Sequence, residues 1–319
     1  MNILICSVGR RVKLVEYFKQ ELGALGGQVI AVDCNPTASA LYFADQYEIV
    51  PRIDNPEYIQ VIKSLCHKYE IDGILSLIDP ELTLLAEYRD EFKDENVHII
   101  VSDKRVVEIC YDKYLTYNFL KEHYIPAVKT YVDIVKVIGD INEGKLTFPL
   151  MVKPKNGSAS LGISKILSIR ELELLQNETK EFVIQPFITG EEFGVDCYID
   201  LLSYKPTNIF IKKKIAMRAG ETDKSISVKD MELTQMVEKL ISVLKPIGPI
   251  DIDCFMTEKG YIISEVNPRF GGGYLHAHEM GQNFVRNIIT NLQGEVVHYN
   301  TSDYDEGITM IRYDQLIIK

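Results

Sequence analysis

The first hundred residues alternate short apolar runs with longer amphipathic stretches, and this alternation restricts the folds that the chain can adopt. The run 2–6 is apolar and typical of a buried strand. Apolar residues then recur at the spacing of a helix, at Val12, Val15, Phe18 and Leu22. Later apolar runs alternate with amphipathic stretches in the same way, at 28–32, 73–78 and 97–101. Repeated strand–helix units of this length predict a parallel, doubly wound α/β sheet.

Two short segments follow predicted strands of this sheet. Asp79 and Pro80 come after the strand at 73–78, and we expect them to be the N-cap and first residue of a helix. Arg10 and Arg11 follow the first strand, and open α/β sheets bind ligands at the carboxyl ends of their strands. These arginines indicate an anionic substrate, although the exposed first turn of a helix could have the same sequence.

The pattern changes at Asp112. A helix is expected at 113–123, and strands with hairpin signals follow it, at 150–154, from 163, at 182–187 and at 193–199. An amphipathic helix at 230–244 and a hairpin at 251–266 complete the pattern. A chain of 319 residues is long enough for two or three packed modules. We predict three modules, at 1–111, 112–190 and 191–319.

Composition excludes several classes of partner. The chain has 35 basic and 46 acidic side chains, a formal net charge of −11, and binding a nucleic-acid backbone needs a basic surface. The basic run 212–214 is too short to change this, although a local group of lysines could still bind ATP. No stretch approaches the roughly 20 apolar residues of a membrane span, and the N-terminus is already a strand candidate. We therefore expect a cytoplasmic protein without nucleic-acid or membrane partners.

The six cysteines are widely spaced and form no C-x-x-C pair, which argues against a zinc or redox site. Most of them have apolar neighbours, so we expect buried, reduced thiols.

The predicted hairpin near the C-terminus has an unusual set of polar residues. Asp251 and Asp253 point the same way, because alternate residues of a strand share a face. A three-residue loop, 258–260, would place Asp253 directly opposite Glu265, with Asn267 on the same face. Two carboxylates and an amide oxygen suit Mg²⁺ shared with nucleotide phosphates. Without a cation the two carboxylates would repel each other.

The alternative for this hairpin is an exposed polar face, but apolar residues flank Glu265 and Asn267. The sequence Pro-Arg-Phe-Gly-Gly-Gly follows at 268–273. Its Arg269 could bind a carboxylate or a transferring phosphoryl group bidentately. The glycines, Gly272 among them, would let a substrate approach the backbone.

The common phosphate-binding fingerprints are absent: there is no G-x-x-x-x-G-K-S/T and no clean G-x-G-x-x-G. Lys153 instead ends an apolar strand before a Gly/Ser-rich turn, 155–162, whose N–H groups could fold over phosphates. The segment 185–192 combines a strand end, a proline and an acidic pair, so that its backbone could bind adenine and a carboxylate could bind ribose. Taken singly, both segments could equally be ordinary hairpins.

Together and in this order, the segments resemble the ATP-grasp superfamily. The resemblance runs through Asp112-Lys113, the strand 149–154 with its glycine loop, 185–196 and Glu265-Val266-Asn267-Pro268-Arg269. It covers essentially the whole chain, because the first hundred residues look like the family's N-terminal domain. Within the superfamily, 7–11 and 76–81 are most similar to stand-alone relatives of the carbamoyl phosphate synthase large subunit. The resemblance implies an ATP-grasp fold with an N-terminal doubly wound domain, a small subdomain with a glycine-rich lid, and a large subdomain with the metal site.

The resemblance also implies roles for individual residues. Nucleotide contacts would come from Lys113, Lys153, Ser158, Gln185, Pro186, Ile188 and Glu192. Mg²⁺ or Mn²⁺ would be held by Asp253, Glu265 and Asn267. Catalysis would depend on Arg269 and Lys153, and substrate contacts on Arg10, Arg218, Arg269 and Gly272. Asp253 and Gln185 stand where many relatives have Glu, and Arg218 could equally be a surface residue.

The chemistry that this resemblance implies is ATP-dependent ligation. A carboxylate would be activated as an acyl phosphate and attacked by an amine or another nucleophile, with ADP and phosphate released. The partners would be a small carboxylate and an amine, and the resemblance is compatible with a homodimer. Two alternatives remain open. One is phosphorylation of bicarbonate or carbamate, as in carbamoyl phosphate synthase, and the other is a non-catalytic nucleotide-binding subunit.

Overall fold

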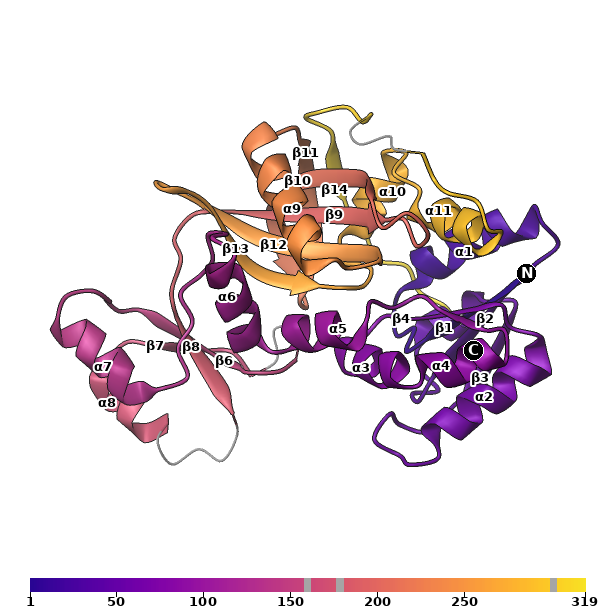
Figure 1. The fold of residues 1–319 in the computed structure, drawn as a ribbon, viewed down its shortest axis with the longest axis horizontal. Helices are drawn as coiled ribbons and strands as arrows, with labels where there is room; N and C mark the ends of the chain where they lie inside the picture. The colour runs from indigo at the N-terminus through magenta and orange to yellow at the C-terminus, as the bar shows by residue number, and fades with distance from the viewer. Residues whose placement is uncertain (158–161, 176–180, 299–302) are drawn as a thin grey trace.

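The computed structural model describes residues 1–157, 162–175, 181–298 and 303–319. Three β-sheets follow one another along the chain, with five, three and six strands. Figure 1 shows the small sheet at one end of the molecule, the five-stranded sheet at the other and the six-stranded sheet beside both. The strands of the three sheets fall within 2–99, 150–186 and 191–311. The limits of the three modules themselves remain a prediction.

The N-terminal sheet is parallel throughout, in the order β3-β2-β1-β4-β5. Its strands are β1 (Asn2–Cys6), β2 (Gln28–Asp33), β3 (Gln46–Ile49), β4 (Gly73–Ser76) and β5 (His98–Ile99). The helices between and after them are α1 (Val12–Gly23), η1 (Ser39–Phe43), α2 (Tyr58–Tyr69), α3 (Asp79–Glu87), α4 (Arg89–Asp94) and α5 (Lys104–Tyr111). Side chains of β1 alternate between two cores. Ile3 and Ile5 pack on the side of α1, and Leu4 and Cys6 on the side of α2. The predicted doubly wound parallel sheet is confirmed.

The small sheet is antiparallel, in the order β7-β6-β8. Its strands are β6 (Leu150–Pro154), β7 (Ser164–Ile166) and β8 (Phe182–Pro186), and its helices are α7 (Ile134–Asn142) and α8 (Ile169–Leu174). Val137 of α7 and Leu172 of α8 share a core with Leu150 and Ile184 of the sheet. Both helices therefore cover one face of the small sheet, which leaves Lys153 near the other.

The large sheet is antiparallel, in the order β13-β12-β9-β10-β11-β14. Its strands are β9 (Glu191–Ile199), β10 (Pro206–Arg218), β11 (Glu221–Val228), β12 (Gly248–Thr257), β13 (Gly260–Asn267) and β14 (Thr309–Ile311). The remaining helices are α6 (Lys113–Glu122), α9 (Met231–Leu244), α10 (Tyr274–Glu279) and α11 (Phe284–Leu292). Helices α6 and α9 pack on one face of this sheet, where Phe119 and Leu240 join Val195 and Ile252 in one core.

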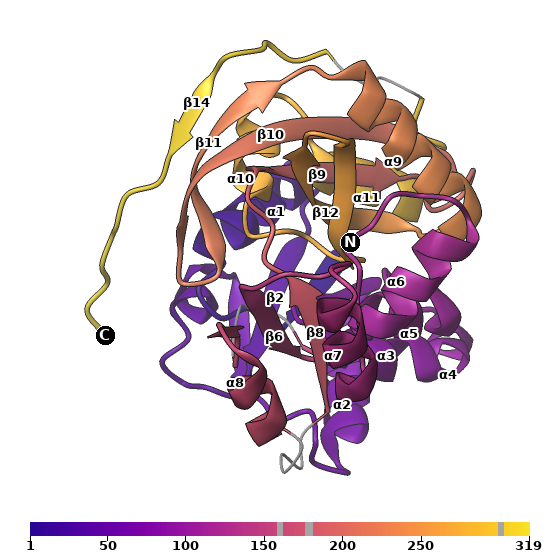
Figure 2. The same ribbon diagram turned by 90° about the vertical axis from the view of Figure 1, so that its left-hand side faces the viewer.

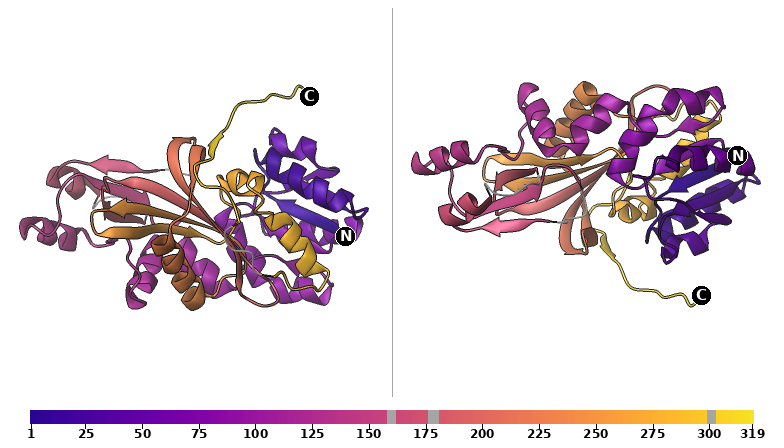
Figure 3. Two further views of the ribbon diagram at one scale, coloured as in Figure 1. Left: turned by 90° about the horizontal axis from the view of Figure 1, so that it is seen from above. Right: turned by 90° about the horizontal axis from the view of Figure 1, so that it is seen from below.

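The other face of the large sheet joins it to the N-terminal sheet. Tyr198 and Phe210 of this face pack in one cluster with Phe270, Phe284 and, from α1, Phe18. Figure 2 shows α10, α11 and α1 close together beneath the large sheet. After β14 the chain leaves the edge of the sheet as an extended segment, 312–319, which Figure 3 shows in two further views. This shared core holds the first strand's carboxyl end against the large sheet.

Two further expectations can be compared with the structure. All six cysteines are free, and five are buried while Cys34 is exposed, which confirms the expectation for most of them. Among the helices in the described part of the chain, none combines the length and apolar character needed to cross a membrane.

Candidate active site

A cavity of about 1080 Å³ lies where the three sheets meet. Most residues that the sequence singled out line it: Arg10, Lys113, Lys153, Gln185, Pro186, Ile188, Glu192, Asp253, Glu265, Asn267, Arg269 and Gly272. Arg218 lines a neighbouring pocket instead, and Ser158 lies outside the described residues. The cavity therefore brings together positions from all three predicted modules.

The acidic hairpin, formed by β12 and β13, brings its polar residues together as predicted. Asp253 lies directly opposite Glu265, and Asp251 lies opposite Asn267. The predicted three-residue loop is wrong, because Thr257 pairs with Gly260 across a two-residue turn. A bulge next to Asp253 shifts the register by one residue and restores the predicted pairing. Asp253 and Glu265 therefore lie opposite each other as predicted, although the turn and the register next to it differ from the prediction.

Lys214 of β10 bridges two of the predicted ligand-binding carboxylates. Its Nζ lies 2.6 Å from Asp253 Oδ1 and 2.7 Å from Glu192 Oε1. Burial opposes the charged form of Lys214, but these carboxylates outweigh it and raise the pKa of the lysine. Sequence reasoning missed this residue, because the basic run 212–214 was considered only as a short, isolated run that could not bind nucleic acid. Strand alternation was the available signal: Lys214 faces the acidic residues, while Lys213 pairs with Glu191 on the other side.

A second lysine of β10 is buried beside this group. Lys212 and Asp196 form an ion pair whose side chains are both 1% exposed. Gly194 of β9 makes room for Lys212 and Lys214, since a Cβ there would lie 3.2 Å from the Cε atom of each. Asp196 pairs across the strands with Asp251, so acidic and basic side chains form one connected network on this face.

Two carboxylates at this site, Asp251 and Glu265, have raised pKa values. Burial raises the pKa of Asp251, and the carboxylates of Asp253 and Asp196 raise it further. Burial also raises the pKa of Glu265, although Lys113 favours its ionised form. Lys113 Nζ is 3.6 Å from Glu265 Oε1. The site therefore has more negative charge than Lys113 and Lys214 neutralise, and an added cation would stabilise it.

The donor set fits a hard divalent cation. Asp253, Glu265 and Asn267 offer two carboxylates and an amide oxygen on adjacent strands, the oxygen ligands that Mg²⁺ prefers. Among the described residues, no group of three or more His, Cys, Asp or Glu side chains is arranged to hold a metal alone.

Two lysines from outside the acidic hairpin line the same cavity. Lys153 is the fourth residue of β6, and burial lowers its pKa, as does the nearby charge of Lys113. Lys113 is the first residue of α6, whose N-cap Asp112 accepts hydrogen bonds from Tyr114 N and Leu115 N. Lys113 Nζ donates to Gly157 O at 2.5 Å. The lysines and the acidic hairpin thus line one cavity, with Lys113 and Glu265 in ion-pair contact.

The predicted adenine segment forms one wall of the cavity. Gln185 is buried and its Nε2 donates to Thr130 Oγ1 at 2.9 Å, so its side-chain amide is engaged within the protein. Pro186 and Ile188 line the cavity, and Glu192 lies further along, held by Lys214. A ligand at this wall would meet the backbone after β8 rather than the Gln185 amide.

Arg269 is fixed by a residue of the N-terminal sheet. Its Nε and Nη2 donate to Asp79 Oδ2 at 3.1 and 3.0 Å, and both side chains are largely buried. The prediction that Asp79 caps helix α3 is wrong, because Asp79 is the first helical residue and its side chain accepts no capping hydrogen bond. The ion pair with Arg269 engages the carboxylate that a cap would have used.

The glycines after Arg269 let side chains of the protein approach the backbone, and their predicted contact with a substrate stays a prediction. A Cβ at Gly271 would lie 2.5 Å from Asp251 Cγ, and one at Gly272 would lie 2.6 Å from Glu221 Cγ. Contacts this short do not occur with real side chains, so only glycine allows these charged groups to reach the backbone. The run therefore admits side chains of the protein itself, and Gly272 also lines the cavity.

The remaining sequence candidates are placed at the side of the cavity or away from it. Arg10 lies 3.4 Å from Glu221 Oε2 and lines the cavity. Arg218 is 46% exposed and is paired with Asp223 and Asp314. His276, another plausible pocket residue, is buried against Ser225 and lines neither described pocket.

Comparison with known proteins agrees with this geometry. The model for the ATP-grasp domain matches residues 110–273, just over half of the chain. The chain belongs to the ATP-grasp family. Residues 3–100 match the model for a PylC-like N-terminal domain, so the two matches together span the N-terminal sheet and most of the rest of the ATP-grasp fold.

Individual ATP-grasp relatives are distant. The chain is 27% identical over 188 residues to a carbamoyl-phosphate synthase of Methanobrevibacter smithii, covering 57% of this chain and 48% of the relative. It is 27% identical over 266 residues to a formate-dependent phosphoribosylglycinamide formyltransferase of Prochlorococcus marinus, covering 78% of this chain and 65% of the relative. The chain thus spans less than two thirds of either relative.

A solved structure shows the same ATP-grasp fold over nearly the whole chain. The biotin carboxylase domain of the Hydrogenobacter thermophilus 2-oxoglutarate carboxylase, a dimer in complex with MgADP, ADP and bicarbonate, has a TM-score of 0.74. The superposition covers 96% of this chain and 73% of that one at 16% identity. At this identity the likeness establishes the fold and leaves the substrate open.

Proposed function

We propose that this protein is an ATP-dependent ligase that activates a carboxylate as an acyl phosphate for attack by an amine or another nucleophile. The observation that carries the proposal is that one cavity holds lysines and carboxylates together. Lys113 and Lys153 line it with Asp253 and Glu265, and Lys113 Nζ lies 3.6 Å from Glu265 Oε1. Such a cavity suits a triphosphate, whose negative charges need cations on several sides.

The proposed roles follow from the surroundings of each residue. Lys113 and Lys153 would bind nucleotide phosphates. Burial lowers the pKa of Lys153, so an anionic partner would favour its charged form, which supports this role. The backbone around Pro186 and Ile188 would meet adenine, with Glu192 at the ribose. Asp253, Glu265 and Asn267 would hold Mg²⁺, which supplies charge neutralisation at the transferring phosphoryl group.

The reaction would proceed in two balanced steps. An oxygen of the substrate carboxylate attacks the γ-phosphorus of ATP, the bond to the bridging oxygen breaks, and ADP leaves. The amine then attacks the acyl carbon, phosphate leaves, and the nitrogen loses a proton to solvent. Arg269, which lines the cavity with its guanidinium held by Asp79, would stabilise charge on the acyl phosphate.

The test is a screen of carboxylates and amines for substrate-dependent ADP release, read by mass for the condensed product. A ligase needs both a carboxylate and an amine for product, whereas a phosphorylating enzyme of the carbamoyl phosphate synthase type would release ADP with bicarbonate alone. Absence of Mg·ATP binding at millimolar concentration would contradict both readings. A non-catalytic subunit would bind Mg·ATP without releasing ADP under any condition.

The oligomeric state is part of the same proposal. The sequence is compatible with a homodimer, and the biotin carboxylase domain with this fold is a dimer. We therefore propose a homodimer, which light scattering of the purified chain would test. A monomeric mass across the micromolar range would contradict it.

A further inference from the structure

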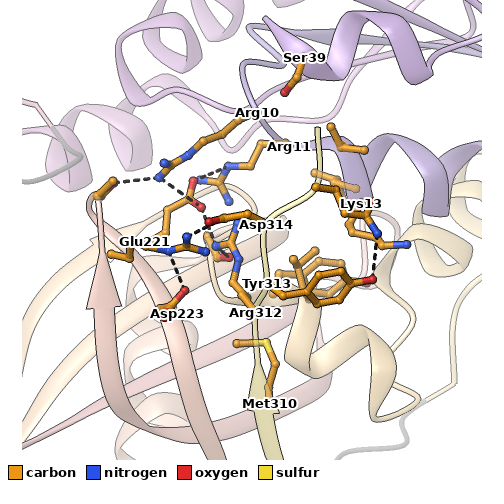
Figure 4. Close-up of a pocket in the computed structure, with 18 of the residues that line it drawn as sticks. Arg10, Arg11, Lys13, Ser39, Glu221, Asp223, Met310, Arg312, Tyr313 and Asp314 are labelled. Carbon is orange, nitrogen blue, oxygen red and sulfur yellow. Dashed lines mark hydrogen bonds and ion pairs between the residues drawn. The ribbon is translucent and has the colours of Figure 1, made fainter. Parts of the chain in front are cut away.

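A second pocket of about 630 Å³ opens beside the nucleotide cavity, and we call it the side pocket. Segments that are distant in the sequence line it: the start of α1, η1, the β10–β11 turn, residues 271–279, and residues 310–317 in and after β14 (Figure 4). Its volume lies within the range of sites for small molecules, which is roughly 300–1,000 Å³.

The side pocket joins the nucleotide cavity at a cluster of arginines. Arg10, Arg11, Glu221 and Gly272 line both spaces. Arg11 Nε lies 3.1 Å from Glu221 Oε1, and Arg312 Nη1 lies 2.7 Å from Glu221 Oε2. Arg10 approaches the same carboxylate at 3.4 Å. Figure 4 shows these groups converging on Glu221 at the mouth of the side pocket.

This arginine junction has more positive than negative charge. In the described part of the chain, Glu221 is the ion-pair partner of all three arginines, and none of them has a second carboxylate within 4.0 Å. Burial opposes ionisation of Glu221, yet Arg11 and Arg312 lower its pKa. Within ion-pair distance one carboxylate serves three guanidiniums, and Asp251 is a further negative charge near Arg11. The junction therefore keeps an excess of positive charge for another anion, in a chain whose net charge is −11.

The rest of the side pocket is mixed: Lys13, Glu279, Arg218, Asp223 and Asp314 line it beside apolar side chains, and both aspartates are ion-pair partners of Arg218. Val12, Leu14 and Phe43 supply apolar surface from the N-terminal part, and Leu275 supplies it from α10. Leu316 of the extended segment also lines the pocket, although its side chain is 82% exposed. An apolar ligand would cover surface that is now in contact with water, which favours binding by about 25 cal/mol per Å².

Resting on the function proposed above, we propose that the side pocket binds the carboxylate substrate, and that this substrate has an apolar body. Its carboxylate lies at the arginine junction, next to the nucleotide cavity, and its apolar body lies against Val12, Phe43 and Leu275. Bicarbonate has no body to fill this pocket. An ammonium group would be repelled by the three arginines.

Three probes separate the two features of the ligand. Isocaproate and isoamylamine have the same branched apolar body and end in a carboxylate or an amine, whereas acetate has the carboxylate without the body. Isothermal titration of the full chain with Mg·ADP present should show isocaproate binding at least tenfold more tightly than acetate, because it buries several more methylene equivalents. Isoamylamine should not bind.

Two arginine variants test whether the arginine junction binds the carboxylate. Arg312→Met and Arg11→Met should each weaken isocaproate at least tenfold, the loss of a charge-assisted hydrogen bond. Arg286→Met is the matched control, because Arg286 is a 68% exposed arginine paired with Glu21 on α1, and it should leave isocaproate binding unchanged. The affinity for Mg·ADP should change less than twofold in Arg312→Met, since Arg312 does not line the nucleotide cavity.

Several results would overturn the proposal. They are equal affinity for isocaproate and acetate, tighter binding of isoamylamine, unchanged binding in both arginine variants, or no isocaproate binding at millimolar concentration. The function proposed above fails separately. Isocaproate binding by a protein that does not bind Mg·ATP would remove the ligase and keep the side pocket. Condensed product that needs both a carboxylate and an amine, formed by a protein that does not bind isocaproate, would keep the ligase and remove the side pocket.

Discussion

Arg269 donates two hydrogen bonds to one oxygen of Asp79, and the two residues are 190 positions apart in the sequence. Asp79 begins α3 of the N-terminal sheet, while Arg269 follows the acidic strand β13. The pair is buried, so each charge depends on the other for compensation. It fixes the N-terminal sheet against the proposed metal site and aligns a guanidinium at the edge of the nucleotide cavity.

Breaking this pair from one side should be strongly destabilising. Asp79→Ala leaves a buried guanidinium without its carboxylate, and we expect the free energy of unfolding to fall by about 3–5 kcal/mol. Urea denaturation measures this. Asp54→Ala, which removes the carboxylate of an exposed pair with Arg52, should change stability by less than about 1 kcal/mol. The double variant Asp79→Ala/Arg269→Met should be more stable than Asp79→Ala alone, and a double variant that is less stable would contradict this account.

Adjacent lysines of β10 allow a matched comparison. Lys214→Met leaves Asp253 and Glu192 without their shared cation, and we expect it to lower the free energy of unfolding by about 2 kcal/mol more than Lys213→Met does. Millimolar Mg²⁺ should restore part of the stability of Lys214→Met, because another cation can then compensate Asp253. Denaturation curves with and without Mg²⁺ test both statements. Equal stabilities of the two variants would show that Lys214 does not support the carboxylates.

Glu265 should matter more for turnover than for nucleotide binding. In Glu265→Gln one proposed metal ligand loses its charge, while the wall around Pro186 and Ile188 is unchanged. We expect the rate of ADP release to fall by at least a hundredfold, about 2.7 kcal/mol of transition-state stabilisation, and the Kd for ADP to rise much less. Glu258→Gln, in the exposed turn of the same hairpin, should retain full activity. Normal turnover in Glu265→Gln would remove this residue from the mechanism.

Buried His276 should make stability depend on pH. Burial, together with Lys212, lowers the pKa of His276 from 6.5 to about 4. Between these values the unfolded chain binds a proton that the folded chain does not, so this contribution is complete above pH 6.5 and is lost as the pH falls towards 4. The loss should be on the order of 3 kcal/mol.

The pH prediction is checked by comparing variants. The difference in unfolding free energy between wild type and His276→Gln should shrink as the pH falls from 7 to 5. Parallel curves for wild type and His276→Gln would contradict the buried neutral imidazole.

The N-terminal sheet and the acidic hairpin show how far sequence reasoning reached. Apolar residues of β1 alternate between two cores, and their local pattern predicted a buried parallel strand. Asp253 and Glu265 were predicted to face each other because their separation along a hairpin is short. The predicted length of the turn was wrong. A two-residue turn followed by a bulge pairs Asp253 with Glu265 just as a three-residue loop would, so spacing alone cannot distinguish the two.

Lys214 and Asp79 show where sequence reasoning stopped. Lys214 lies 39 residues from Asp253 along the chain, and Asp79 lies 190 residues from Arg269. Nothing in the local pattern of either residue indicates its partner, because the contact depends on how separate elements pack. The arginine junction is of the same kind, since Arg11, Glu221 and Arg312 come from three distant segments.

By itself, the sequence determined the periodicity of the elements, the family to which they belong and the chemical types of the candidate ligands, because these depend on neighbours within a few residues. Only the tertiary structure decided which charges compensate one another and where a second pocket opens. Coulomb interactions and burial depend on distance in space, so the ion pairs of Arg269, Lys214 and Glu221 exist only after the three sheets have packed together.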